Sequence, residues 1–281
     1  MAQPVTLSYC AEQVRRYDHD RYMTAIFAPA AVRENLFALY AFNIEIAKVR
    51  EAVTEPLIGR MRLQWWRDTL DRLFAGETVA HAVAAPLGQA IRVASLDRMA
   101  FERLIDAREA DLEDAPPKDM RALEAYAEDT GAPLLDLAFQ LAGASVADPE
   151  AARLAGTAWS LTGLLRAVPF HARYRRIYLP EDVLAAHAVR IQRLLDLKPG
   201  EGFTDAVRTI GERAYELLRD LPGRVGGVPR VARSPALIAS LSRYYLHDLE
   251  RCGWDPFVLE RRPPRPLLVG RLALRAALHG Y

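Results

Sequence analysis

The stretch "AAVRENLFALYAFNIEIAKVREAV", residues 30–53, decides the fold class of this 281-residue chain. Its apolar residues recur at intervals of three and four positions, at Val32, Leu36, Leu39, Tyr40, Ile44 and Ala47. That spacing predicts one apolar stripe on a helix and does not fit the alternation of a strand. Pro29 lies just ahead of the stretch and Pro56 just beyond it, which predicts one amphipathic helix between the two prolines.

The same periodicity extends over most of the chain. The next helix is predicted to begin at Pro56 and end at Gly76, with Leu57, Met61, Trp65, Leu70 and Phe74 on related faces. Further helices are predicted over residues 79–93, 97–110, 119–143, 149–169, 203–220 and 234–252. Strand signals are nearly absent, and the breaks at 115–117, 198–202, 222–229 and 261–266 are short. We therefore expect an all-α fold and a single helical domain spanning residues 1–281.

Composition excludes several classes of function. Lys+Arg 37 against Asp+Glu 36 leaves a net charge of +1, which argues against a nucleic-acid-binding protein. Cys10 and Cys252 are too few for a disulfide framework or a cysteine zinc site. The first residues do not resemble a signal or transit peptide, and no run approaches the roughly 20 apolar residues of a spanning helix. We expect a cytoplasmic protein in a bacterium.

Two charged segments have ordinary structural explanations. Glu45 and Glu51 are six residues apart, on well-separated faces of a helix, so solvated ion pairs are favoured over a metal site there. The run "LIDAREADLEDAPP", residues 104–117, carries Asp106, Glu109 and Asp111. A solvated acidic helix end is the usual origin of such a run, and magnesium binding is the alternative.

The segment "LLRAVPFHARYRRIYLP", residues 164–180, is the strongest candidate for a site. Pro169 is expected to kink or end the helix, and His171 and three arginines follow Arg166, namely Arg173, Arg175 and Arg176. Arginines near a histidine can hold phosphate or carboxylate groups. Basic side chains that meet the last carbonyls of a helix are an equally good explanation. No P-loop, GxSxG elbow, HExxH helix or dinucleotide fingerprint is present.

The order of several motifs resembles the squalene/phytoene synthase family from about residue 8 to the end. These motifs are "FALYAF" (37–42), "MRLQWW" (61–66), "LIDAREADLED" (104–114), "LEAYAEDTGAPL" (123–134) and "LLRAVPFHARYRRIYLP". The resemblance implies an isoprenoid-synthase-type helical bundle. It also implies two aspartate-rich motifs on facing helices, whose carboxylates bind Mg²⁺ and, through it, two prenyl diphosphates.

This sequence departs from the family pattern at both motifs. The acidic positions of the first motif correspond to Ala47, Lys48 and Glu51, and those of the second to Ala167 and His171. The resemblance therefore implies a degenerate diphosphate site without a metal. The candidate anion-binding residues that remain are Arg166, Arg173, Arg175, Arg176 and Tyr178.

The "MRLQWW" and "VPFHARYRRIYLP" motifs are most similar to a degenerate branch of this family that lacks the aspartates. That similarity implies a non-catalytic role in assembling respiratory complex I, with complex I subunits or assembly intermediates as partners. It leaves room for a prenyl or lipid ligand in the pocket. The alternative is an active Mg²⁺-dependent prenyltransferase that couples two prenyl diphosphates and recruits its metal through Asp106 and Asp111.

The segment "RRPPRPLLVGRLALRAALHGY", residues 261–281, combines arginines with leucines. A short basic amphipathic helix of this kind can lie on an anionic membrane surface. The more common arrangement is that such a helix packs on its own domain. The sequence leaves both open, with peripheral contact at the inner membrane as the sharper hypothesis.

Overall fold

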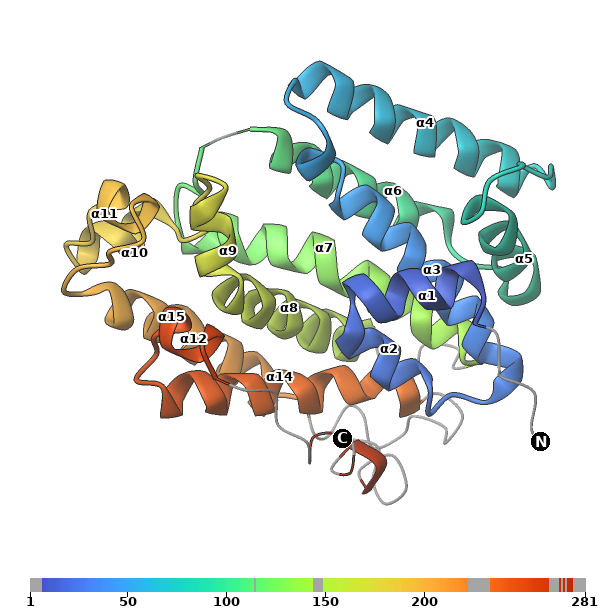
Figure 1. Cartoon of the computed structure of the whole chain (residues 1–281). Coiled ribbons are helices and arrows are strands. Elements are labelled where there is room, and N and C mark those ends of the chain that lie inside the picture. Colours follow the sequence, from blue (N-terminus) through green and yellow to red (C-terminus); the bar gives the residue numbers. More distant parts are fainter. Residues whose placement is uncertain are drawn as a thin grey trace.

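The computed structural model describes residues 7–113, 115–143, 149–221 and 233–262, together with 268, 270 and 272–274. Within those residues the regular elements are helices and no strand occurs, which confirms the all-α prediction (Figure 1). The helices are α1 (Tyr9–Tyr17), α2 (His19–Ala25), α3 (Ala30–Ala47), η1 (Arg50–Ala52), α4 (Pro56–Phe74), α5 (Ala84–Ala94), α6 (Arg98–Glu109), η2 (Ala110–Leu112), α7 (Met120–Leu141), α8 (Pro149–Arg166), α9 (Val168–Arg173), α10 (Glu181–Ala186), α11 (Ile191–Leu195), α12 (Phe203–Arg219), α14 (Arg233–Arg251) and α15 (Pro256–Glu260).

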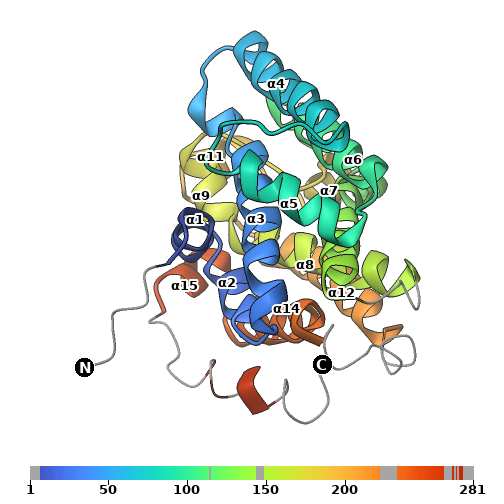
Figure 2. The ribbon, with the colours of Figure 1, turned by 90° about the vertical axis from the view of Figure 1, so that its right-hand side faces the viewer.

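Helix α3 runs through the interior rather than along the surface. Every residue from Leu36 to Ile44 is buried, so the prediction of a single apolar stripe was wrong. The helix packs against α1, α5 and α7, and Figure 2 shows the side of the molecule on which α1, α3 and α5 lie. A helix enclosed by neighbours is apolar on all sides. The residues at three- and four-residue spacing are only some of its buried residues, so the spacing alone suggested a single stripe.

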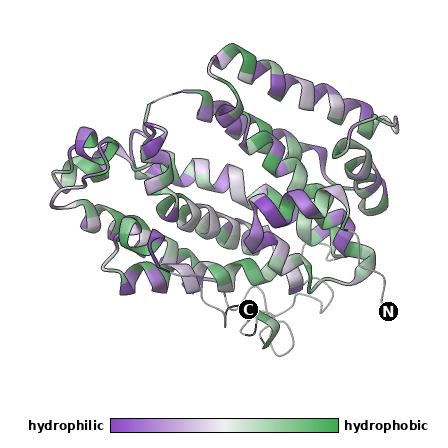
Figure 3. Cartoon of the chain, viewed as in Figure 1, coloured by the Kyte–Doolittle hydropathy of each residue, from purple (hydrophilic) through white to green (hydrophobic). Residues whose placement is uncertain are grey.

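Helix α4 packs through a face that only partly matches the predicted one: Leu70 and Phe74 pack into the core as predicted, whereas the other three predicted residues do not. Its buried residues are Gly59, Leu63, Trp66, Thr69, Leu70 and Leu73. The predicted core residues Leu57, Met61 and Trp65 are exposed by 65%, 64% and 43%. Hydrophobic and hydrophilic residues alternate along this helix (Figure 3), so the pattern allows more than one packed face. Trp66 decides between them, because its ring packs edge-on against Phe42 of α3 at 5.0 Å.

The predicted helix over residues 79–93 begins later than expected, at Ala84. The preceding residues form a turn in which Nδ1 of His81 accepts hydrogen bonds from the amides of Val83 and Ala84, both at 3.3 Å. The imidazole thus accepts hydrogen bonds from amides that have no partner within the helix at its start. It caps the helix there, so the residues before it do not need to be helical.

Helices α7 and α8 lie side by side and contact each other through glycine. A Cβ atom on Gly131 would lie 2.2 Å from the carbonyl oxygen of Gly156, and one on Gly156 would lie 2.6 Å from the backbone of Gly131. The two backbones therefore approach each other more closely than any larger residue allows. The predicted break at Pro169 is confirmed, since α8 ends at Arg166 and α9 begins at Val168.

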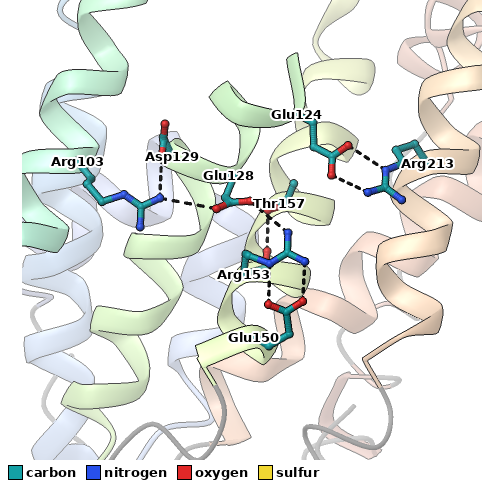
Figure 4. A network of polar contacts seen from close by, with 8 residues as sticks. All are labelled: Arg103, Glu124, Glu128, Asp129, Glu150, Arg153, Thr157 and Arg213. Atoms are coloured by element: carbon teal, nitrogen blue, oxygen red, sulfur yellow. Dashed lines mark hydrogen bonds and ion pairs between the residues drawn. The ribbon is translucent and has the colours of Figure 1, made fainter. Parts of the chain in front are cut away.

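A network of ion pairs joins four helices on the outside of this contact (Figure 4). Arg103 of α6 contacts Asp129 of α7 at 2.6 Å. Arg153 of α8 bonds Glu150 and reaches Glu128 of α7 at 3.2 Å. Arg213 of α12 forms two hydrogen bonds, at 2.9 and 2.7 Å, with Glu124 of α7. The network fixes α7 relative to its three neighbours, although each exposed pair contributes little by itself.

The described part of the chain contains no helix with the length and hydropathy needed to cross a bilayer. Most of the predicted C-terminal amphipathic helix lies outside the described residues. Of its leucines that are described, Leu272 is buried in the same apolar cluster as residues of α8 and α14, Leu268 packs against that cluster, and Leu274 is exposed. Packing on the body of the protein therefore accounts for two of these three leucines.

Candidate functional site

A cavity of about 540 Å³ opens where the end of α3 meets α9 and the segment after it. Its lining comes from seven helices, α3, η1, α6, η2, α7, α8 and α9, and from the segments that follow η1 and α9. The lining residues are Ala47, Arg50, Glu51, Val53, Thr54, Arg108, Asp111, Tyr126, Leu164, Phe170, His171, Tyr174, Arg176 and Tyr178. The folding of the chain thus brings Ala47, from the stretch predicted to be the first degenerate motif, to the same cavity as His171, from the predicted second motif.

Asp111 organises the polar wall of this cavity. Its Oδ1 accepts hydrogen bonds from the hydroxyls of Tyr126 at 2.7 Å and Tyr178 at 2.8 Å. Its Oδ2 accepts one from Arg108 at 3.3 Å, and its backbone carbonyl accepts one from Arg176 at 3.1 Å. Asp111 itself is buried, with 6% exposed. Tyr126, Tyr178 and Arg108 together satisfy a carboxylate that would otherwise be costly to bury.

The electrostatics of this wall follow from burial and from these contacts. Burial raises the pKa of both Tyr126 and Tyr178, and the charge of Asp111 raises them further, so both phenols stay protonated donors. For Arg108, burial by itself lowers the pKa, but Tyr126 and Asp111 outweigh it and the net change is upward. Arg108 also donates to the Tyr126 hydroxyl at 2.8 Å. The wall is therefore a charged pair stabilised by two neutral phenols.

His171 lies next to this wall on α9. Its ring centroid is 4.5 Å from that of Tyr178, and its Nδ1 is buried with no hydrogen-bond partner among the described residues. Burial lowers the pKa of His171 to about 4, while Asp111 raises it and Arg176 lowers it. The imidazole is therefore neutral at pH 7 and has an unsatisfied ring nitrogen.

The turn after α9 directs Arg176 and Tyr178 to the cavity. Arg175 has φ 56°, the left-handed conformation that commonly ends a helix. The Arg176 amide then bonds the carbonyl of His171, five residues back, at 2.9 Å. This closing bond reverses the chain, so that both side chains reach Asp111. Arg175 itself is exposed and does not line the cavity.

The other predicted anion-binding arginines lie elsewhere. Arg166 forms an ion pair with Asp20 at 3.0 Å and lies 3.4 Å above the ring of Tyr245. Arg173 forms two hydrogen bonds with Glu260 of α15 at the surface. Neither lines the cavity. Of the five residues, the structure brings only Arg176 and Tyr178 together with the degenerate motifs.

Of the positions predicted to form the degenerate motifs, some line the cavity and others do not. Ala47 and Glu51 line the cavity, whereas the Lys48 ammonium lies 2.9 Å from the ring centroid of Tyr17 in α1. In the second motif His171 lines the cavity, but Ala167 precedes α9 as its N-cap and does not. In the first motif, the residue four positions before Glu51 is Ala47, which lines the cavity but has no polar group. In the second, the residue four positions before His171 is Ala167, which does not line the cavity.

Most of the acidic run at residues 104–117 is solvated, as predicted: the side chains of Asp106, Glu109 and Glu113 are exposed, and Asp111 is the buried exception. Asp106 and Glu109 contact Arg67 of α4 at 2.6 and 2.8 Å, and Glu113 contacts Arg60 at 3.1 Å. These pairs bind α4 to α6 and its continuation. Asp106 does not line the cavity, whereas Asp111 does. Asp106 and Asp111, the two residues named as alternative metal ligands, therefore lie at different sites: Asp106 pairs with Arg67, and Asp111 lines the cavity.

Sequence reasoning missed Arg108, Tyr126 and Arg50 as lining residues. Arg108 lies inside an acidic run, where it looks like the partner of a neighbouring carboxylate. Tyr126 lies in the family-like stretch "LEAYAEDTGAPL", which by itself does not indicate that the tyrosine faces a cavity. A second cavity, of about 250 Å³, shares Asp111, Tyr126, Arg176 and Tyr178 with the first. The Asp111 cluster therefore forms a wall between two hollows, which no linear pattern indicates.

The residues of this cavity do not fit the magnesium site that the family implies. Mg²⁺ prefers several carboxylate or other hard oxygen ligands in octahedral geometry. The lining contains two carboxylates, Glu51 and Asp111, against three arginines, and both oxygens of Asp111 already accept hydrogen bonds. Across the described residues, no group of three or more His, Cys, Asp or Glu side chains could hold a metal ion.

The fold and cavity define an all-helical isoprenoid-synthase-type protein whose polar pocket lacks carboxylate pairs. The model of the squalene/phytoene synthase family matches residues 14–269, and the chain belongs to that family. It is 33% identical to complex I assembly factor 6 of Rattus norvegicus, over 89% of this chain and 75% of the relative. It is 28% identical to presqualene diphosphate synthase of Rhodopseudomonas palustris, over 58% of each chain. The crystal structure of a dehydrosqualene synthase with a ligand superposes with a TM-score of 0.82, at 16% identity, covering 95% of this chain and 94% of that one.

Proposed function

We propose that this chain is a non-catalytic squalene/phytoene synthase-like protein that acts in the assembly of respiratory complex I. Two independent lines support the proposal. The chain is similar to complex I assembly factor 6 over most of its length. Its cavity also presents Ala47 and His171 at positions where the resemblance predicts metal-binding carboxylates. Complex I subunits or assembly intermediates are then its partners.

The composition of the cavity wall carries the proposal. Where the family pattern has carboxylates, the cavity presents Ala47 and His171, and Lys48 is directed to Tyr17 instead. The buried Asp111 is fully engaged by Arg108 and the two tyrosines. Glu51 is the one lining carboxylate without such partners. A single carboxylate beside several guanidinium groups is a poor ligand set for a divalent cation.

A cavity that binds metal ions poorly is not suited to cleaving a prenyl diphosphate. Ionisation of a prenyl diphosphate requires that the charge developing on the diphosphate be neutralised, and bound metal ions supply several kcal/mol of that stabilisation. Arginines and tyrosines can bind a diphosphate, but a site whose three arginines and two carboxylates sum to a formal charge of +1 neutralises only part of its charge. We therefore expect binding chemistry in this cavity rather than bond cleavage.

The enzymatic alternative is tested by incubating the purified chain with farnesyl diphosphate, with and without Mg²⁺, and measuring released pyrophosphate and lipid products. No release is expected in either condition, and an active presqualene diphosphate synthase serves as the positive control. Mg²⁺-dependent release would establish a prenyltransferase and overturn the proposal. The Asp106→Ala and Asp111→Asn variants would then show whether those acids recruit the metal.

The assembly role is tested in the host organism. Deleting the gene should lower the amount of assembled complex I on native gels and the NADH:quinone reductase activity of membranes, while succinate oxidation is unchanged. Complementation with the intact gene should restore both. Normal complex I in the deletion strain would rule the role out. Cell fractionation of the same strain tests the accompanying proposal that the chain is cytoplasmic and peripheral at the inner membrane.

A further inference from the structure

Helix α4 has a second apolar face, opposite the one that packs into the core. Leu57, Met61 and Trp65 follow one another at intervals of four residues, and Ile58 lies beside them. All four side chains are exposed, that of Ile58 by 46%. At 3.6 residues per turn they form one stripe along the first half of the helix. We call these four residues the α4 stripe.

The described part of the chain does not cover the α4 stripe. Helix α4 packs on α5, α6 and η2 through the face that contains Leu63, Trp66 and Leu70. Figures 1 and 2 both show α4 at one end of the molecule, with no other helix beyond it. The apolar face that the sequence predicted as core is therefore real, but it is left open. Exposed apolar patches of this kind mark interaction sites.

The spacing of the α4 stripe suits contact with another helix. Side chains four residues apart form a ridge, and such ridges pack into the grooves on the surface of a neighbouring helix. The ring of Trp65 is already held edge-on by Trp66, at 4.9 Å between centroids, and by His81, at 5.1 Å. An aromatic side chain that is fixed before binding loses little freedom and is a typical anchor of a protein interface.

The two edges of the α4 stripe carry different charges. On the edge towards α6, Arg60 pairs with Glu113 at 3.1 Å and Arg67 with Asp106 at 2.6 Å. On the other edge, Arg62 is exposed and forms no hydrogen bond or ion pair with any described residue. Its guanidinium is therefore available to a carboxylate of a molecule that docks on the stripe.

These charges disfavour an anionic membrane as the occupant. Such a surface attracts clusters of basic residues that have no acidic partner. Beside the α4 stripe the exposed carboxylates of Glu113 and Asp106 neutralise two of the arginines, which leaves only Arg62 on the opposite edge. One unpaired arginine gives little attraction to a bilayer.

A second copy of this chain is disfavoured as well. A contact between two identical surfaces is self-complementary about a two-fold axis. If that axis passed through Met61, the centre of the stripe, the Arg62 of one copy would lie beside an arginine of the other. That arginine is Arg62 when the helices are antiparallel and Arg60 when they are parallel. Like charges placed together in this way oppose association.

We propose that the α4 stripe docks a helix of a protein partner, which carries an apolar stripe of its own and a carboxylate at the edge that meets Arg62. The inference goes beyond the proposed function by assigning the surface and the type of partner. It rests on that function only for the identity of the partner, a complex I subunit or assembly intermediate. None of the four stripe residues lines the cavity, so docking uses a separate surface.

Photo-cross-linking in the host organism tests the proposal on the full chain. p-Benzoyl-phenylalanine replaces Met61, the cells are irradiated, and mass spectrometry identifies the cross-linked peptide. We expect one protein partner, joined at a segment whose apolar residues recur every three or four positions beside an Asp or Glu. Val93 of α5 is the control position, because it is apolar, 68% exposed and outside the stripe. It should give no such product.

Charge reversal tests the predicted ion pair. Arg62→Glu should lower the cross-linking yield at position 61 roughly tenfold, and changing the partner's carboxylate to Lys should restore it. Arg121→Glu is the matched control, since Arg121 is an exposed arginine of α7 outside the stripe. Leu57→Gln removes apolar area without changing the charge and should also lower the yield roughly tenfold. Thermal unfolding establishes that the variants are folded, and Leu57→Gln serves if Arg62→Glu is not.

Four results would overturn the proposal. They are a cross-link between two copies of the chain, a yield at position 61 no higher than at position 93, a yield that neither Arg62→Glu nor Leu57→Gln changes, and flotation on phosphatidylglycerol vesicles that Leu57→Gln abolishes. The last result would place the stripe on a membrane.

These outcomes are separate from those of the proposed function. Reduced complex I in the deletion strain together with any of the four results would remove this inference and leave the assembly role in place. A cross-linked helix in a protein unconnected with complex I would support the docking surface and count against the assembly role.

Discussion

The Tyr178 hydroxyl donates a hydrogen bond to Oδ1 of Asp111 at 2.8 Å, across 67 positions of sequence. This contact attaches the segment after α9 to the end of α6, and it makes one wall of the cavity from two distant motifs. Each residue lies in a stretch that resembles the family pattern. Asp111 thus holds this wall of the cavity together through its neighbours Tyr126, Tyr178 and Arg108.

Replacing Asp111 by Asn should lower the free energy of unfolding by about 2–4 kcal/mol, because it leaves the buried Arg108 guanidinium without a counter-charge. The measurement is urea unfolding at pH 7. Glu113→Gln is the control, because Glu113 pairs with Arg60 at the surface and should cost less than about 1 kcal/mol. Equal losses in the two variants would mean that Asp111 is not a structural centre of the cavity.

The stability of the protein should fall at acid pH because of His171. Burial lowers the pKa of this residue from 6.5 to about 4, so the unfolded chain takes up a proton that the folded chain does not. Stability from this residue is complete above pH 6.5 and is lost as the pH falls from 6.5 to 4. Over that interval the loss amounts to roughly 2–3 kcal/mol.

His171→Gln removes this dependence and provides the measurement. Unfolding free energies of the two proteins, taken at pH 7.5 and pH 4.5, should differ in their change with pH by roughly 2 kcal/mol. The titration of all other groups is common to both chains and cancels. Parallel pH curves for the two proteins would show that the folded-state pKa of His171 is not lowered.

Gly156→Ala should destabilise the protein by about 1–3 kcal/mol, because a Cβ there would lie 2.6 Å from the backbone of α7 and force α7 and α8 apart. Gly163→Ala is the matched control in the same helix, with nothing within 4 Å of the added Cβ. Alanine is the better helix former, so the control should gain up to about 1 kcal/mol. Thermal unfolding measures both, and a stabilised Gly156→Ala variant would contradict the close approach.

Lys48→Met should cost about 0.5–1 kcal/mol through loss of the contact between the ammonium and the Tyr17 ring. The double variant with Tyr17→Leu should lose less than the sum of the two single changes, since each change alone removes the same contact. Complex I levels in cells should be unaffected. Fully additive losses in the double variant would show that the Lys48 ammonium and the Tyr17 ring do not interact.

The helical class and most helix positions could be predicted from the sequence because both depend on local properties. Proline positions and the spacing of apolar residues fixed the start of α4 and the break at Pro169, which the structure confirms. The packed face of α4 could not be predicted. Trp65 and Trp66 are neighbours in sequence, and only the position of Phe42 in α3 decides which ring is buried.

For the cavity, the sequence by itself determined which residues are available: it supplies Ala47, Glu51 and His171 at the positions where the resemblance predicts carboxylates. The tertiary structure alone decided which of the remaining polar groups meet. It turned Lys48 to Tyr17 and Arg166 to Asp20, and it brought Arg176 to Asp111. The reason is that a side chain's partner depends on the crossing of helices far apart in sequence, whereas its chemistry is carried by the residue itself.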